Sequence, residues 1–253
     1  AAGCCIECNI RCFYSMMNNQ TEGKVNTRIG ILLAAIAALA SSSTFAAGRT
    51  HDVKILRSSG QSIQIEYTPK YYEPQTIKFK DKEFVEYDFE CSSQLATLRE
   101  VGVPDLKSKH MPLGFPSKEG NAVQVLAADY EDISNVLLKP TPTLHTKDGM
   151  LVVQDYSINN ERYAQNQFLP GKVAELSSVE SSRSMLLGSL KVYPIQYNPA
   201  TKTLRRYSRI VVEVVYGSST AVRVQNDDDD LFGYSLLNAN DAKLWKFGSP
   251  QPL

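Results

Sequence analysis

The sequence has 253 residues, and its 27 Lys and Arg residues balance 27 Asp and Glu residues, so its formal net charge is zero. This balance argues against a nucleic-acid-binding protein, which needs a basic surface to displace counterions from phosphates, and we predict no nucleic-acid partner. With 43% hydrophobic and 21% charged residues, the chain can bury a core and is not a disordered polymer. Its 13 Tyr and 12 Pro residues favour strands and turns over a helical bundle.

Four of the five cysteines lie in the first 12 residues, ahead of Met16, the first methionine. Thiolates at such spacings can hold zinc or an iron–sulfur cluster. Because this cluster precedes a plausible start and a leader sequence, we instead expect residues 1–15 to be upstream sequence from a misassigned start. No metal site is predicted.

Residues 16–47 have the layout of a secretory signal peptide. Basic Lys24 and Arg28 precede the apolar run 29–40, and small residues follow it up to Ala46 and Ala47. The apolar run is shorter than the roughly 20 residues that a membrane span needs. We therefore expect cleavage near Ala46 or Ala47, a secreted or cell-surface location, and no stable membrane span afterwards.

Strand patterns dominate residues 48–217, which we predict to form an all-β, antiparallel β-sandwich domain. Ile63, Ile65 and Tyr67 alternate with polar residues, as in a half-buried strand. After the leader only one cysteine, Cys91, is left, so no disulfide can form within this part of the chain. Its stability must come from its core.

The middle of the chain is less regular. Residues 99–118 are punctuated by prolines and are predicted to be irregular, whereas Val123, Val125 and Ala127 alternate as in a strand. The polar stretch 144–168 is predicted to be mainly loop with one strand near residues 151–153, since it has few residues that could fill a core.

The last third begins with a predicted strand over residues 188–197, a tight turn at 198–203 and a long β-branched return over 204–215. Residues 218–253 are expected to be a linker and a short helix that lead to a peptidase domain absent from this chain. The Asp227–Asp230 run is predicted to be solvated. Asn240 is the expected N-cap of the helix.

Motifs for common enzyme chemistry are missing from the sequence. It has no Gly-x-Ser-x-Gly elbow, no phosphate-binding Gly-x4-Gly-Lys loop and no His-Glu-x2-His zinc pattern. Its three histidines are scattered. A nucleophilic cysteine would have to be Cys91, whose neighbour Glu90 disfavours the thiolate. No cofactor is predicted.

The block of residues 188–214 resembles the closing strands of the propeptides of gingipain-type (C25) cysteine peptidases. Its most specific part is the hairpin that contains Tyr193, Pro194, Tyr197, Asn198 and Pro199. Residues 102–106 resemble a Gly-x-Pro-x-Leu segment of the same propeptides. One difference is that these propeptides often carry Arg-Gly before the closing strands, where this chain has Arg183 followed by serine.

This resemblance implies a β-sandwich pro-domain that assists folding and keeps a caspase-like peptidase domain latent. The implied partner is the chain's own C25 peptidase domain, in cis. The Cys–His dyad of such peptidases has no matching positions in this sequence, so no catalytic residue is carried over.

Some propeptides of this type place a basic side chain in the active-site cleft of their enzyme. Lys147, beside Asp148 and Gly149, is our first candidate for this role, and Arg162 is the second. Arg223, just before the Asp run, is a candidate site for processing.

The sequence is also compatible with two other hypotheses about function. The chain could be a free-standing secreted β-sandwich that binds glycans or a surface protein through an aromatic strip of Tyr67, Tyr71 and Tyr72. It could also be an enzyme that depends on Cys91.

Overall fold

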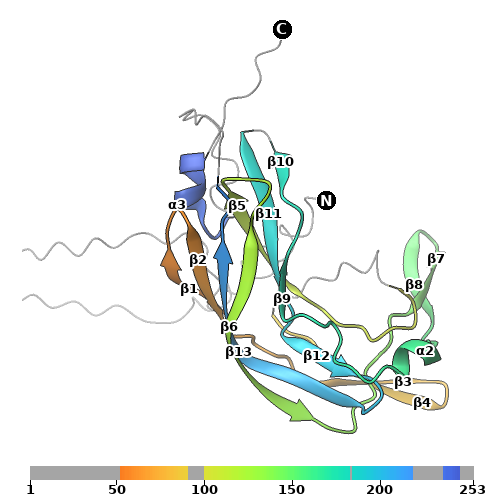
Figure 1. Cartoon of the computed structure of the whole chain (residues 1–253). Coiled ribbons are helices and arrows are strands. Elements are labelled where there is room, and N and C mark those ends of the chain that lie inside the picture. Colours follow the sequence, from red (N-terminus) through yellow and green to blue (C-terminus); the bar gives the residue numbers. More distant parts are fainter. Residues whose placement is uncertain (1–51, 91–99, 183, 219–235, 246–253) are drawn as a thin grey trace, which may run out of the picture. The chain divides into compact units, whose positions relative to one another are not determined.

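The computed structural model describes residues 52–90, 100–182, 184–218 and 236–245. Outside these ranges lie the predicted leader with Ala46 and Ala47, the thiol of Cys91, Arg183, Arg223 and the Asp227–Asp230 run. The described residues form antiparallel sheets with few helices, which confirms the predicted all-β class (Figure 1). No helix within them has the length and hydropathy to cross a bilayer.

The first sheet is built around the long strand β13 (Thr203–Val215). One edge of β13 pairs with β6 (Ala122–Ile133) along almost its whole length. Its other edge is shared by β12 (Ile195–Asn198) and β2 (Ser62–Tyr67), and β1 (Val53–Ser58) pairs with β2. The β-branched run predicted as a strand is therefore the centre of the sheet.

The second sheet is built around β11 (Met185–Val192). It pairs with β5 (Lys109–Phe115) on one edge and with β9 (Ala174–Leu176) and β10 (Glu180–Ser182) on the other. The prediction that residues 99–118 are irregular was wrong for β5. A proline is tolerated there because β5 is an edge strand of this sheet.

The two sheets pack face to face over the larger of two hydrophobic cores, which confirms the predicted sandwich. Ile63 and Ile65 of β2 and Val212 of β13 lie in one cluster with Leu113 of β5 and Leu190 of β11, and all five are fully buried. Each such side chain stabilises the fold by about 1.5–3 kcal/mol relative to an exposed one. The alternation seen in the sequence thus corresponds to the face that each strand buries.

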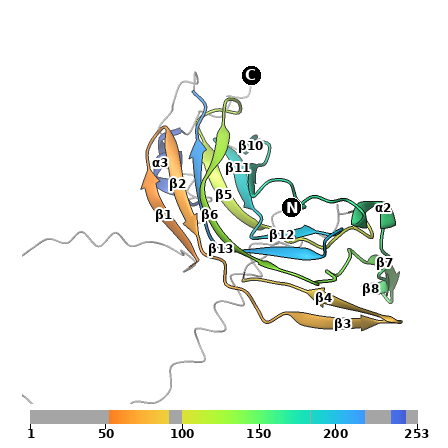
Figure 2. The same cartoon turned by 60° about the horizontal axis from the view of Figure 1, so that its bottom comes forward.

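A smaller core lies beside the hairpin of β3 (Gln75–Phe79) and β4 (Lys82–Glu86) (Figure 2). It consists of Tyr87, Phe89, Val136, Leu138, Ile195, Tyr197 and Leu204. Since β12 and the start of β13 contribute to it, residues of the first sheet take part in both cores.

Residues 143–163, predicted to be mostly loop, contain a hairpin and a helical turn. Strands β7 (Thr143–Lys147) and β8 (Met150–Asp155) form the hairpin, and α2 (Asn160–Tyr163) follows. The expected strand near 151–153 lies within β8. The prediction missed β7 because a hairpin held by its own turn needs no residues that fill a core.

The C-terminal helix α3 (Ala239–Ala242) is followed by the 3-10 turn η2 (Lys243–Trp245). The short helix was expected, but it is not merely a part of a linker, because Ala242 and Trp245 are buried in the larger core. Its N-cap is Asn238 and not Asn240. The side chain of Asn238 makes no capping hydrogen bond because its amide is bonded to β5 instead.

Candidate functional site

The tip of the β7–β8 hairpin presents Lys147. Asp148 and Gly149 form the two-residue turn, and their φ angles of 51° and 78° are both positive, as a type I′ turn requires. Lys147 ends β7 directly opposite Met150, and its side chain is exposed. Within the described part of the chain, Lys147 makes no ion pair. The sequence Lys-Asp-Gly thus places an exposed positive charge beside a tight turn.

Apolar side chains on both strands of this hairpin are open to solvent. Met150 is 70% exposed, and Leu144, Val152 and Val153 are also exposed. The register places Met150 and Val152 on the same face of the hairpin as Lys147. A basic tip on an apolar hairpin is typical of a surface that binds another protein.

The root of the hairpin is attached to the β3–β4 hairpin, beside which it lies in Figure 2. The ring of Tyr156 packs edge-on against Phe79 at 5.2 Å between centroids, and Lys80 forms an ion pair with Asp155 at 3.0 Å. The backbone of Thr141 is bonded to the segment that contains Gly102. The structure therefore fixes the root of the hairpin and leaves the tip exposed.

Arg162, the second basic candidate, already has a partner. It lies in α2, and its guanidinium binds Glu100 through a contact of 2.7 Å. The hydrogen bond from Arg162 lowers the pKa of the Glu100 carboxyl. Since Arg162 would have to give up this contact to enter a cleft, the geometry favours Lys147.

The family-motif hairpin is a structural element and not an exposed site. The Tyr197 hydroxyl donates to the carbonyl of Val136 at 2.8 Å, in the smaller core. The Tyr193 hydroxyl donates to Glu175 at 2.7 Å, and the Pro194 carbonyl accepts from Tyr71 at 2.8 Å. These contacts join the closing strands to the smaller core and to β9 of the second sheet.

The rest of the motif forms the turn between β12 and β13. The Asn198 side chain accepts from the Thr201 backbone N–H at 3.3 Å and donates to Asn166 at 3.0 Å. Pro199 follows directly, in the turn itself. The motif that suggested the family is therefore a signature of the fold.

The aromatic strip of the binding-module reading does not exist as a surface. Tyr67 is completely buried. The Tyr71 hydroxyl donates to the carbonyls of Pro194 and Tyr207, and burial raises its pKa although Arg206 opposes the shift. Of the three, only Tyr72 is exposed. Tyr67 instead shares the buried face of β2 with Ile63 and Ile65.

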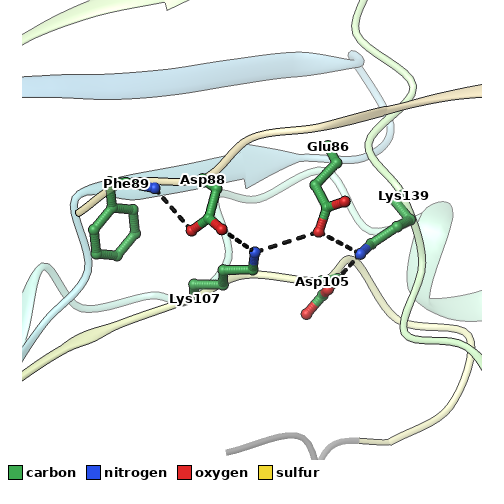
Figure 3. A network of polar contacts seen from close by, with 6 residues as sticks. All are labelled: Glu86, Asp88, Phe89, Asp105, Lys107 and Lys139. Carbon is green, nitrogen blue, oxygen red and sulfur yellow. Dashed lines mark hydrogen bonds and ion pairs between the residues drawn. The ribbon is translucent and has the colours of Figure 1, made fainter. Parts of the chain in front are cut away.

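The sequence analysis missed a network of buried charges, which Figure 3 shows. The Lys107 side chain is 2% exposed and contacts Asp88 at 2.8 Å and Glu86 at 3.3 Å. Lys139 contacts the same oxygen of Glu86 and reaches Asp105 at 3.2 Å. Two lysines are thus enclosed by three carboxylates.

This network is suited to a structural role. Burial acts to lower the pKa of Lys139, but the hydrogen bond to Glu86 and the charge of Asp105 outweigh it, and the pKa is raised. A lysine that acts as a base needs the opposite shift. Lys139 also lies only four residues before β7. The network therefore ties the end of β4 to the chain that leads into the β7–β8 hairpin.

The described residues thus define an antiparallel β-sandwich with a fixed core and an exposed basic hairpin. The sequence matches the C25 peptidase propeptide family (Propeptide_C25) over residues 43–233. The chain belongs to this family, as the closing strands suggested.

Comparison with known proteins agrees with this assignment. Gingipain R1 of Porphyromonas gingivalis is 26% identical over 191 residues, which are 74% of this chain and 19% of that protein. Gingipain R2 of the same species is 30% identical over 129 residues, which are 51% of this chain and 17% of that protein. The chain spans about a fifth of the length of the curated relatives that it matches.

Two solved structures share the fold. One is the complex of the pro- and mature domains of RgpB from P. gingivalis, with a TM-score of 0.63 and 21% identity, covering 76% of this chain and 99% of that chain. The other is a structure on the zymogenic latency of gingipain K from the same species, with a TM-score of 0.53 and 16% identity, covering 65% and 92%.

Proposed function

We propose that this chain is the pro-domain of a C25 cysteine peptidase precursor, that it binds the peptidase domain of that precursor in cis, and that it keeps that domain latent and assists its folding. Membership of the propeptide family supports this role over a free-standing glycan- or protein-binding module. The relatives support it as well, since one solved complex pairs a pro-domain of this fold with a mature domain.

The observation that carries the proposed mechanism is the β7–β8 hairpin. Lys147 is exposed at the end of β7, beside the two-residue turn of Asp148 and Gly149, and the hairpin carries exposed apolar side chains. Contacts of Tyr156 and Asp155 fix the root of the hairpin. A substrate-like lysine held this way can fill an acidic pocket while the turn keeps the backbone in a pose unsuited to cleavage. A hairpin held in its bound conformation binds more tightly than a flexible loop, because it loses less conformational entropy on binding.

Inhibition of the precursor's own peptidase domain by purified pro-domain variants tests this role of Lys147. Loss of one partner of a buried ion pair at an interface costs about 2–5 kcal/mol, so Lys147→Ala should raise the inhibition constant by roughly 30-fold or more. Arg162→Ala should change it little. Lys202→Ala is the matched control, since Lys202 is also an exposed lysine at a hairpin turn.

An unchanged inhibition constant for Lys147→Ala, with a normally folded variant, would contradict the role of Lys147. A loss of inhibition only in Arg162→Ala would transfer that role to Arg162.

We also propose that the precursor is exported through the leader over residues 16–47 and processed near Arg223. The apolar run with Ala46 and Ala47 after it supports export, and the basic residue before an acidic run supports processing. Mass spectrometry of the exported protein should find termini at these two places. Active enzyme with an intact segment around Arg223 would contradict the second cleavage.

A further inference from the structure

Residues 236–245, called the docked segment below, belong to the sandwich although residues 219–235 separate them from β13 in sequence. Leu236, Ala242 and Trp245 are buried in the larger core. The ring of Trp245 packs on Tyr216 with 4.9 Å between centroids. Figure 1 shows α3 beside β1 and β5. This part of the chain therefore contributes to a core built by distant strands.

The docked segment is hydrogen-bonded to the edge of β5 that β11 leaves unpaired. The backbone N–H of Leu237 donates to the carbonyl of Pro112 at 3.1 Å. The side-chain amide of Asn238 accepts from the Gly114 N–H and donates to the Gly114 carbonyl, both at 2.8 Å. The amide thus takes the place of a neighbouring strand's peptide group, as in the addition of a strand to a sheet edge.

The surface that receives the docked segment is complementary to it in shape and polarity. A Cβ at position 114 would lie 2.5 Å from the Cβ of Ala242, so the contact requires glycine on β5. The Asn238 amide also donates to the Tyr216 hydroxyl at 2.9 Å. Ser58 of β1 donates to the carboxylate of Asp241. The bond from Ser58 is exposed, whereas the peptide groups of Gly114 and the amide of Asn238 are buried and are paired with each other only when the segment is in place.

We propose that the β5 edge around Gly114 is a peptide-binding site whose ligand is residues 236–245 of the same chain, and that this site holds its ligand without a covalent connection. Cleavage anywhere within residues 219–235 then cuts the chain but leaves the downstream part attached to the domain. Cleavage of the chain and dissociation of its downstream part then become two different steps. This proposal does not depend on the inhibitory role of Lys147.

The test uses the full exported chain with a site-specific protease sequence placed within residues 219–235. After cleavage, the C-terminal fragment should co-elute with the domain in size-exclusion chromatography. The fragment should separate when the chain carries Asn238→Ala. Asn240→Ala is the matched control, because Asn240 lies on the same helix with an exposed side chain, and its fragment should stay bound.

A second measurement keeps the domain unaltered and so excludes misfolding as a cause. A fluorescent peptide of residues 236–245 should exchange into the cleaved domain, as followed by anisotropy, and unlabelled peptide should compete with it. The Asn238→Ala peptide should compete roughly tenfold or more weakly, because three buried groups lose their partner. The proposal is wrong if the unsubstituted fragment separates after cleavage or if both peptides compete equally.

Discussion

Glu86 is the residue on which the buried charge network depends, since one of its oxygens contacts both Lys107 and Lys139. Burying a charge is costly unless it is paired, and removing one partner leaves the others uncompensated. The pKa of Lys139 is raised above its ordinary value of 10.5. The ion pairs of Lys139 therefore stabilise the fold fully at neutral pH, and this stabilisation is lost only as the pH rises through the raised pKa.

Replacing Glu86 with Gln should therefore lower the free energy of unfolding by about 3 kcal/mol, the lower end of the range for a broken buried pair, because Glu86 is partly exposed. Chemical denaturation measures the loss. Glu83→Gln is the matched control, since Glu83 lies on the same strand with an exposed side chain and should change stability little. Equal midpoints for the two variants would show that the network does not stabilise the domain.

Single residues also show where prediction from the sequence reaches its limit. The sequence neighbours of Lys107 and Lys139 give no sign that three carboxylates enclose these two side chains. Alternation identified Ile63 and Ile65 as core residues because the period of a strand fixes which side chains share a face. It does not show which charges tertiary packing will bury.

Among the strands, those whose apolar and polar residues alternate clearly were predicted. Strands whose formation depends on their place in the sheet or on a turn were missed in whole or in part. β2 and β13 were predicted because their apolar residues follow the pleat. β5 was missed because Pro112 argues against a strand unless the strand is known to lie at an edge. The β7–β8 hairpin was half found, because its stability comes from its turn and its root. The turn beside Lys147 was nevertheless predicted, since the Asp-Gly pair that follows it favours a turn.

The contact between β5 and α3 yields a prediction of its own. Gly114→Ala should destabilise the domain by roughly 1–3 kcal/mol, because the new methyl group overlaps Ala242. Adding Ala242→Gly should restore part of this loss, less the roughly 1 kcal/mol that glycine costs in a helix. Thermal unfolding of the two single variants and the double variant measures the coupling. Strictly additive effects would show that α3 does not pack on Gly114 as described.

For the whole molecule, the two proposed binding elements depend on different parts of the sandwich. The β7–β8 hairpin is attached through β3–β4 and lies near the smaller core, whereas the docked segment is buried in the larger one. Changes at well-separated sites are usually additive. We therefore expect that Lys147→Ala leaves the docked segment bound after cleavage. Asn238→Ala should weaken the binding of the docked segment and leave the charge at the hairpin tip in place.

The balanced charge and the single cysteine after the leader agree with the way the domain is stabilised. Balanced charge is consistent with the many ion pairs on the sheet faces, such as those of Arg205 with Asp132 and of Arg206 with Glu131. With one cysteine after residue 47, the domain relies on its two cores and its buried charge network in place of disulfides.

The proposed function requires that this domain binds a C25 peptidase domain and blocks it. Adding the purified domain, residues 48–253, to the separately purified peptidase domain of its precursor and measuring peptide hydrolysis tests this requirement. We expect stoichiometric, reversible inhibition and co-elution of the two domains as one complex. Full activity in the presence of excess folded domain, with no complex formed, would contradict the proposed function.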